Sequence, residues 1–249
     1  MNLLLFEQQE LNGNSRLQLK GNDRRAQHIR NILDLHVGDT VRVGEVNGNQ
    51  GEGIILRIDD HGVEMEIDLV ESPRHDRNIT LVLALPRPIM LQRILKQATV
   101  MGVRTFHLIR SEKVQKSYFQ SNILKQESIR NILLQGLEQA MDTHLPEVHV
   151  HKRFKPFVED VVPKMASGSF LLAHPEADLT LPEIYNKGSL CNELVLAIGP
   201  EGRWNDFEVQ LFMDQGFFGF SVGSRILHVD TAVLVLLSQV MLLHEMSVL

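Results

Sequence analysis

The chain has 249 residues, of which 43% are hydrophobic, and a formal net charge of −6. This length and apolar content are enough for one large or two small domains with a buried core. The single cysteine, Cys191, excludes an intrachain disulfide and is typical of a protein of the reducing cytoplasm. No basic-then-apolar leader is evident, and the longest apolar stretch, 232–243, is too short to span a bilayer, so no membrane association is expected.

Residues 1–72 predict a small β-barrel, because short apolar or alternating runs are separated by turns rich in Gly, Asn and Asp. The expected strands are Leu3–Phe6, Thr40–Val46, Gly53–Ile58 and Val63–Val70. A helix is expected from Asp23 to Leu35, with Asn22 as its N-cap and with Ala26, Ile29, Ile32 and Leu33 roughly on one face. Glu71-Ser72-Pro73 has the composition of a linker, which predicts a domain boundary between residues 72 and 73.

Residues 73–249 predict an α/β domain, because apolar strands alternate with helical segments. This alternation is typical of a mostly parallel sheet. The expected strands are Ile79–Leu85, Thr105–Ile109, Phe170–Ala173, Leu194–Ile198 and Phe217–Val222. One expected helix follows Pro86 and Pro88 and runs to about Met101. The others are Asn122–Met141, Asp206–Gln215, and a last helix from Asp230 to about Glu245.

Charge is distributed unevenly along the chain. Residues 73–130 contain 11 Lys and Arg against 3 Asp and Glu, a net charge of +8, whereas residues 1–72 carry −6 and residues 131–249 carry −8. A basic segment of this kind can attract phosphate even in an acidic protein. The alternative is that these charges belong to solvated helix faces and are paired elsewhere.

Three loops in the C-terminal half each follow a short apolar strand. They are His174-Pro175, Gly199-Pro200-Glu201-Gly202 and Gly223-Ser224-Arg225-Ile226-Leu227. In open α/β sheets, ligands bind beyond the carboxyl ends of strands, and glycine there lets the backbone approach a ligand closely. The glycine spacing matches neither the dinucleotide nor the phosphate-loop motif. A ligand pocket built by two glycine loops is one interpretation, and tight turns without a ligand are the other.

Two motifs at these loops carry a family resemblance. "LAIGPEGRWNDFEV" followed by "GFFGFSVGSRILHVDTAV" closely resembles the ribosomal RNA uridine-N3 methyltransferase family (RsmE-like) of the SPOUT superfamily. "HIRNILDLHVGDTV", "LALPRP", "LKQATVMGV" and "SEKVQKSYF" extend the likeness over most of the chain. The resemblance implies a PUA-like β-barrel followed by a trefoil-knotted α/β domain. It also implies a homodimer that binds S-adenosylmethionine in the knot and methylates N3 of a uridine in small-subunit (16S) rRNA.

The resemblance implies roles for individual residues as well. The three loops would bind S-adenosylmethionine largely through backbone groups, which explains their small and apolar residues. The implied cofactor residues are Leu172, Ala173, His174, Ile198, Gly199, Pro200, Glu201, Gly202, Val222, Gly223, Ser224, Ile226 and Leu227. The candidate RNA contacts are Arg25, Arg87, Arg93, Lys96, Lys113, Lys116 and Tyr118. Phe119 could stack on a base beside Tyr118, or could simply pack in the core.

Five departures from the family pattern bear on the expected activity. Where the family usually has QKATELGV, this chain has Gln97 and Val100 in place of a lysine and a glutamate. Where it usually has RILRTETA, this chain has His228 and Asp230, and Arg203 replaces the last glycine of GPEGG. These changes indicate a divergent branch, and they affect the expectation for the target base more than that for the cofactor.

Three residues are candidates for the chemistry. Removal of the N3 proton leaves negative charge on the uracil oxygens, which Arg225 could stabilise. Glu201 or Asp230 could position the base or accept the proton. Each has a structural alternative. Arg225 could pair across a dimer interface, Glu201 could close its loop onto backbone amides, and Asp230 could be a helix N-cap.

Other functions compete with this one. A related enzyme could methylate a ribose 2′-hydroxyl or another RNA position, although RILHVDTAV lacks the Asn-Val-Ser type of turn found in ribose methylating relatives. The departures at Gln97 and Val100 also allow a ribosome- or RNA-binding protein without activity. No metal is expected, because His149 and His151 alternate on one strand face without a third ligand nearby in the sequence.

Overall fold

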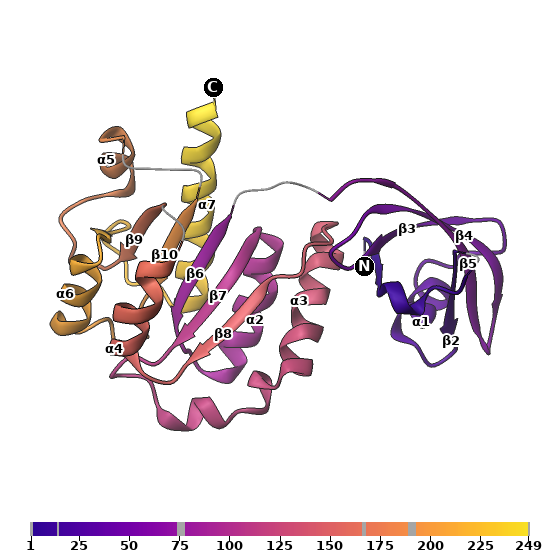
Figure 1. The fold of residues 1–249 in the computed structure, drawn as a ribbon, viewed down its shortest axis with the longest axis horizontal. Coiled ribbons are helices and arrows are strands. Elements are labelled where there is room, and N and C mark those ends of the chain that lie inside the picture. Colours follow the sequence, from indigo (N-terminus) through magenta and orange to yellow (C-terminus); the bar gives the residue numbers. More distant parts are fainter. Residues whose placement is uncertain (1, 14, 74–77, 166–167, 189–192, 249) are drawn as a thin grey trace. The chain divides into compact units, whose positions relative to one another are not determined.

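The computed structural model describes residues 2–13, 15–73, 78–165, 168–188 and 193–248. The chain forms two compact units (Figure 1). One contains residues 1–75 together with 134–145, and the other contains residues 76–133 and 146–249. Cys191 lies outside the described residues.

The first unit is built on a five-stranded sheet with the order β1-β3-β4-β5-β2. β1 pairs with β3 in parallel, and the other neighbours are antiparallel. The arrangement fits a small barrel domain. The strands and the long helix of this unit are β1 (Leu4–Phe6), β2 (Arg16–Lys20), α1 (Arg24–Asn31), β3 (Thr40–Glu45), β4 (Gln50–Asp59) and β5 (Gly62–Glu71), with the short helix η1 (Gln8–Glu10) after β1.

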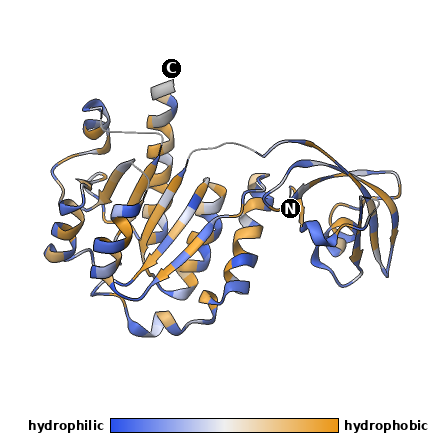
Figure 2. Cartoon of the chain, viewed as in Figure 1, coloured by the Kyte–Doolittle hydropathy of each residue, from blue (hydrophilic) through white to orange (hydrophobic). Residues whose placement is uncertain are grey.

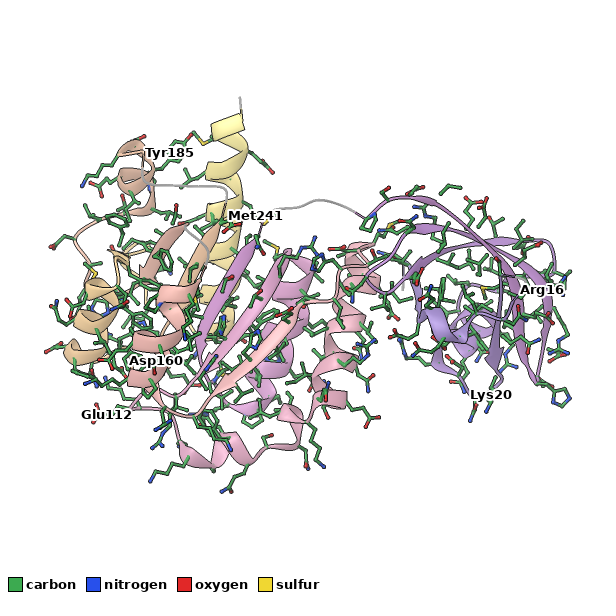
Figure 3. The ribbon with its side chains drawn as sticks, viewed as in Figure 1. Arg16, Lys20, Glu112, Asp160, Tyr185 and Met241 are labelled. Carbon is green, nitrogen blue, oxygen red and sulfur yellow. The ribbon has the colours of Figure 1, made fainter. Side chains whose placement is uncertain are left out.

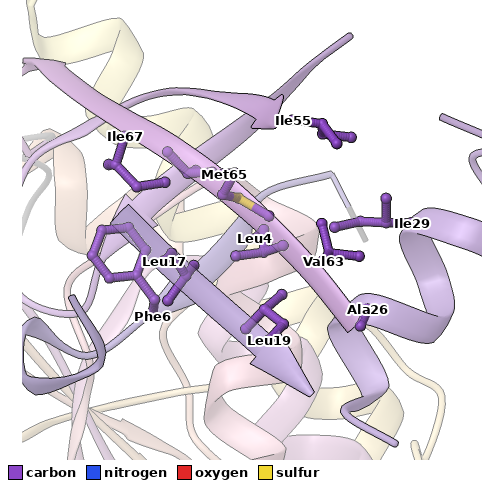
Figure 4. Packing of buried hydrophobic residues seen from close by; sticks show 11 residues of the cluster. Leu4, Phe6, Leu17, Leu19, Ala26, Ile29, Ile55, Val63, Met65 and Ile67 are labelled. Atoms are coloured by element: carbon purple, nitrogen blue, oxygen red, sulfur yellow. The ribbon is translucent and has the colours of Figure 1, made fainter. Parts of the chain in front are cut away.

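The core of this unit lies between the sheet and α1. Alternate residues of β2 and β5 point inward, among them Leu17, Leu19 and Met65, and they meet Ala26 and Ile29 of the helix (Figure 4). All five side chains are at most 3% exposed. The two-residue spacing of the strands and the three-residue spacing of the helix therefore converge on one apolar interior.

The helix α1 is shorter than the sequence predicts. Its N-cap is Asp23, whose carboxylate accepts a hydrogen bond from the Arg25 amide at 2.7 Å, so the prediction of Asn22 is wrong by one residue. The helix ends at Asn31 rather than Leu35, and Asp34 adopts a left-handed φ of 51°. Ile32 is consequently 69% exposed instead of packing on the inner face. The strand β2 was also absent from the sequence-based expectation.

Residues 134–145 belong to the first unit although they lie far away in the sequence. Leu137 packs in a second apolar cluster with Leu3 and Leu5. The Glu138 carboxylate accepts two hydrogen bonds from the Arg24 guanidinium, at 2.6 and 2.9 Å, and the Glu138 carbonyl accepts one from the Leu3 amide. This segment includes the end of α3 (Gln126–Ala140), so the β-rich unit is completed by a helix from the α/β half of the sequence.

Arg25, a candidate for RNA contact, is occupied inside this unit. Its side chain is 14% exposed and binds the carboxylates of Glu10 and Asp23 at 2.6 and 2.8 Å, as well as the Leu5 carbonyl. Burial disfavours the charge, but the hydrogen bonds that the guanidinium donates to Asp23 and Glu10 raise the pKa of Arg25 above its ordinary value. This guanidinium ties α1 to the start of the chain and has few donors left for a phosphate.

The second unit contains a six-stranded parallel sheet with the order β11-β9-β10-β6-β7-β8 (Figure 1). Its central strands are largely apolar, as Figure 2 shows. The elements are β6 (Ile79–Ala84), α2 (Pro88–Val100), β7 (Val103–Ile109), α3, β8 (Glu147–His151), α4 (Phe154–Pro156), β9 (Ser169–Ala173), α5 (Leu181–Asn186), β10 (Leu194–Ile198), α6 (Asp206–Asp214), β11 (Phe218–Phe220) and α7 (Val229–Val248). Short helices lie at η2 (Lys116–Gln120), η3 (Asn122–Leu124), η4 (Phe157–Val161) and η5 (Val162–Lys164).

The α/β prediction for this half is confirmed, with local differences. The long helix expected over Asn122–Met141 is interrupted, because Lys125 is extended with φ −64° and ψ 138° between η3 and α3. The last helix begins at Val229, so Asp230 lies in its first turn and is not the N-cap. Within the described residues, no helix is long and apolar enough to cross a membrane.

Three histidine rings meet on β7 and β8. His107 and His149 are paired across the two strands and their rings stack at 5.0 Å, while Nδ1 of His107 lies 2.9 Å from Nε2 of His151. Phe157 covers His107 and His151 with ring distances of 5.5 and 4.7 Å. Among the described residues, no group of three His, Cys, Asp or Glu side chains is arranged to hold a metal ion. Burial, followed by the charges of His151 and His149, lowers the pKa of His107 to about 3.

Acidification should therefore destabilise the protein through His107. Its pKa in the folded state, about 3, is below the unfolded value of 6.5, so the unfolded chain binds the proton first and stability falls as the pH drops below 6.5. Between pH 7 and pH 5 we expect the free energy of unfolding to decrease by about 2 kcal/mol from this group. Urea unfolding at several pH values measures the decrease. His107→Leu should flatten this dependence and His228→Gln, at an exposed residue, should not; equal slopes in both variants would contradict the assignment.

Candidate active site

The carboxyl ends of β9, β10 and β11 meet at one cavity. β10 lies between β9 and β6, all three run parallel, and β11 flanks β9, so the loops that follow them leave the same edge of the sheet. The cavity has a volume of about 280 Å³, near the lower end of the roughly 300–1,000 Å³ typical of ligand pockets. The first turns of α7, which follow the third loop, close one side with Val229, Ala232 and Leu236.

The structure brings together most of the residues that the three loops predict. The lining comprises Ala173, His174, Pro175, Ile198, Gly199, Pro200, Glu201, Gly202, Arg203, Trp204, Phe220, Ser221, Val222, Gly223, Arg225, Ile226, Leu227, Val229, Ala232 and Leu236. Two predicted cofactor residues are not part of it: Leu172 is fully buried in β9, and Ser224 is exposed. Trp204, Phe220 and the α7 residues were not predicted, because they look like ordinary core residues in the sequence.

Trp204 shapes the wall beside the second glycine loop. A Cβ atom on Gly199 would lie 3.0 Å from the indole nitrogen and 3.1 Å from its neighbouring ring carbon, so any larger residue there requires the indole to shift. Trp204 is only 3% exposed, yet its Nε1 has no hydrogen-bond partner among the described residues. Nδ1 of His174 is likewise buried without a described partner. A ligand with hydrogen-bonding groups would satisfy these two wall atoms.

The charged groups at the cavity come from different elements. The Glu201 carboxylate lies 3.2 Å from the guanidinium of Arg87, which caps the start of α2. Arg93, further along α2, lies 3.9 Å from the Asp230 carboxylate in the first turn of α7. The loop residue Arg225 lines the cavity and is exposed, and no described residue forms an ion pair with it. Both carboxylates are thus held by α2, while one cation stays available for a ligand.

The second glycine loop is held by two further contacts. Nζ of Lys113, in the segment after β7, donates a hydrogen bond to the Gly202 carbonyl. Arg203 adopts a left-handed φ of 64° and pairs with Glu176. Glycine would adopt that φ without strain, so the family's usual glycine is accounted for at this position.

The other candidates for RNA contact are scattered. Lys96 is half-buried on α2, Lys116 is exposed at the start of η2, and Tyr118 and Phe119 are half-buried in the same short helix. None of these four lines the cavity. Arg87, Arg93 and Lys113 instead contact loops or helices of the site, so their position favours a role in holding its loops and carboxylates.

Comparison with protein families identifies the chain. The model of the RNA methyltransferase domain family matches residues 73–241, which include all three loops of the cavity. The chain belongs to this family. It is 30% identical over 239 residues to a protein of Treponema pallidum named ribosomal RNA small subunit methyltransferase E, covering 93% of this chain and 87% of the relative. A Borreliella burgdorferi protein named ribosomal RNA small subunit methyltransferase E 1 is 25% identical over 232 residues, covering 93% of this chain and 94% of its own.

Solved structures share the fold along nearly the whole chain. A ribosomal RNA small subunit methyltransferase E from Neisseria gonorrhoeae, bound to S-adenosyl methionine, matches with a TM-score of 0.74 and 20% identity, covering 96% of both chains. A structure from Legionella pneumophila with bound SAM matches with a TM-score of 0.77 and 21% identity, again covering 96% of both chains. At 20% and 21% identity, these likenesses establish the fold of this chain and nothing more.

The close contact between Gly199 and Trp204 predicts a selective effect of added side-chain volume. Gly199→Ala should displace the indole, lower the free energy of unfolding by roughly 1–3 kcal/mol, and shift the fluorescence of Trp204, the only tryptophan of the chain. Gly219→Ala is a matched control, since its Cβ would lie 3.6 Å from Ala177, an ordinary contact. Urea unfolding followed by fluorescence measures both. A Gly199→Ala variant as stable as the control would contradict this prediction, because Trp204 could then move at no cost in free energy.

Proposed function

We propose that the protein is an S-adenosylmethionine-dependent methyltransferase that forms N3-methyluridine in small-subunit (16S) ribosomal RNA. The observation that carries the proposal is the cavity at the ends of β9, β10 and β11, inside the segment that the RNA methyltransferase family matches. The names of relatives that cover most of the chain support small-subunit rRNA as the substrate. The resemblance of the two loop motifs to the uridine-N3 family supports N3 as the methylated atom.

The residues of the cavity fit S-adenosylmethionine. Apolar side chains such as Ile198, Val222 and Leu227 suit an adenine ring, and the backbone of the glycine loop can approach a ligand closely. The unpartnered nitrogens of Trp204 and His174 suit the acceptor atoms of its ribose or carboxylate. When bound, this group supplies a methyl group already activated by its sulfonium centre. The similar structures from Neisseria gonorrhoeae and Legionella pneumophila were solved with the same ligand bound.

The protein's own residues have three tasks in this reaction. Arg225, at the cavity and without a described partner, stabilises the negative charge that develops on the uracil oxygens when N3 loses its proton. Glu201 accepts that proton or orients the base, and its ion pair with Arg87 fixes the direction of the carboxylate. Asp230, held by Arg93, is the second candidate for this task. The apolar walls exclude water from the reacting atoms.

The finer features of the family complete the proposal. Residues 1–72 are proposed to form a PUA-like domain that recognises RNA, and residues 73–249 a trefoil-knotted SPOUT domain. A cytoplasmic homodimer is proposed, supported by apolar side chains exposed on α7, where Met241 (labelled in Figure 3), Leu242 and Met246 are 36%, 57% and 52% exposed. An apolar helix face of this kind is typical of the surface through which two copies of a chain associate.

Binding of the cofactor is the first test. Isothermal titration of the whole protein with S-adenosylmethionine should show one saturable site, and the titration should change the fluorescence of Trp204 in the cavity wall. Gly199→Val should abolish both signals because its side chain displaces the indole and fills the cavity, whereas Gly219→Ala should retain them. No binding by the unaltered protein would favour the alternative of an RNA-binding protein without activity.

The role of Arg225 has its own test. Arg225→Ala should lower the rate of methyl transfer to small ribosomal subunits or 16S rRNA by roughly 100-fold, because one charge-stabilising donor is removed, while binding of S-adenosylmethionine should persist. Lys187→Ala, at an exposed residue away from the cavity, is the control. Mapping the modified nucleotide on the product distinguishes N3-methyluridine from ribose methylation. Full activity of Arg225→Ala would refute the role given to this residue.

A further inference from the structure

A second depression lies next to the proposed active site, beyond the carboxyl ends of β7 and β8. It has a volume of about 510 Å³. Its lining comprises Arg110, Ser111, Glu112, Lys152, Arg153, Phe154, Lys155, Asn205, Phe207 and Glu208. None of these lines the first cavity, but Trp204 of that cavity and Asn205 of this depression are consecutive residues, so the two sites are neighbours.

The depression is rich in unpaired positive charge. Of its four cations, only Lys155 has a described ion-pair partner, Glu159 at 3.5 Å. Within the described parts of the chain, Arg110, Lys152 and Arg153 form no ion pair, and the last two are exposed. Three unpaired cations around one hollow provide a strong attraction for an anion.

Neither of the two described carboxylates of the lining forms an ion pair with these cations. Glu208 is 2% exposed, and its oxygens accept hydrogen bonds from the amides of Glu112 and Asn205 at 2.8 and 3.1 Å. The carboxylate of Glu112, which Figure 3 labels, accepts a hydrogen bond from the side-chain amide of Asn205. Both acids therefore fix the segment after β7 against the start of α6 and form no ion pair with the described cations of the lining, where four cations outnumber two acids.

Ser111 gives an independent indication of a ligand. Its side chain is 1% exposed, and its Oγ lacks a hydrogen-bond partner among the described residues. A buried hydroxyl without a partner is costly, and the oxygen of a phosphate at this wall would accept its hydrogen bond. The residue directly follows Arg110, so a charged and a neutral donor lie together in the wall.

Aromatic side chains stand beside the cations. Phe207 is 58% exposed in the first turn of α6, which leaves it available to a planar group. Phe154 is half-buried, packs edge-on against Phe212 at 5.3 Å, and contacts Trp204 at 6.1 Å. An exposed aromatic ring next to unpaired cations is the combination that binds a base together with its backbone phosphate.

We propose that this depression binds a backbone phosphate of the substrate RNA, through Arg110, Ser111, Lys152 and Arg153, and stacks an adjacent unpaired base on Phe207. This inference rests on the proposed function, because a methylated base must leave its stack and its neighbours on the strand are then splayed apart. The depression would hold such a neighbour while the first cavity holds the target. An acidic segment of a ribosomal protein is the competing ligand that the experiment must exclude.

Removal of two exposed cations tests the phosphate contact. Binding of a fluorescein-labelled 12-nucleotide oligouridine and of deproteinised 16S rRNA is measured by anisotropy and filter binding at several salt concentrations. The double variant Lys152→Gln, Arg153→Gln of the full chain should bind both RNAs about tenfold more weakly. The slope of log affinity against log salt should become shallower by about 0.7 for each phosphate that the variant no longer neutralises. Lys164→Gln, Lys187→Gln removes the same charge from exposed positions elsewhere in this unit and should change neither quantity.

Two single variants measure the contributions of the Ser111 hydroxyl and the Phe207 ring to RNA binding separately. Ser111→Ala should weaken RNA binding while leaving the thermal unfolding midpoint unchanged or higher, because the hydroxyl has no described partner in the fold. Phe207→Ala should weaken binding roughly 5- to 100-fold without altering the salt slope, since stacking involves no phosphate charge. Wild-type affinity in both variants would overturn the assignment of these contacts.

The outcomes distinguish this inference from the proposed function. If the unaltered protein binds RNA but neither binds S-adenosylmethionine nor methylates rRNA, the proposed function fails, and the RNA affinities still test the depression. If the double variant binds both RNAs with the wild-type affinity and salt slope, the inference is wrong. It is also wrong if only methylation of assembled subunits is impaired, because the ligand is then a ribosomal protein.

Discussion

β10 determines where chemistry can occur in this molecule. All five of its residues are at most 4% exposed, and it hydrogen-bonds in parallel to β9 on one edge and to β6 on the other. A strand with no free edge or face can offer a ligand only its carboxyl end. The loop that begins at Gly199 is therefore placed against the loops after β9 and β11. The cavity lies between these loops, where the backbone rather than long side chains can approach a ligand.

The charges around that cavity are organised by one helix. α2 begins at the carboxyl end of β6 and packs against α7, so Arg87 and Arg93 reach Glu201 and Asp230 respectively. The departure from the family's usual glutamate at Asp230 shortens a side chain, yet the carboxylate still lies 3.9 Å from Arg93. Exposed ion pairs of this kind contribute little stability, so we infer that they serve mainly to orient the carboxylates. A basic segment that looks like an RNA surface in the sequence thus has two of its arginines turned toward the site.

Sequence patterns predicted the α/β half well because its strands are continuous apolar runs; β10 extends over Leu194–Ile198 as expected. They missed β2, whose alternation of Arg16, Gln18 and Lys20 with two leucines is short and mostly polar. They also extended α1 to Leu35, because helical periodicity continues past the point where the backbone turns at Asp34. At the site, glycines marked the loops, but Trp204 carried no signal, since its role depends on a contact with Gly199 that only the fold creates.

The end of α3 makes the β-rich unit discontinuous in the gene. Leu137 covers Leu3 and Leu5, and Glu138 binds both Arg24 and the backbone of the first strand region. A recombination event that transferred only the codons for residues 1–75 would leave these leucines and Arg24 without their partners. Exchange of this unit between related proteins would need two crossover points, or matching substitutions on a helix more than a hundred residues away. The two sequence segments therefore form a single structural module.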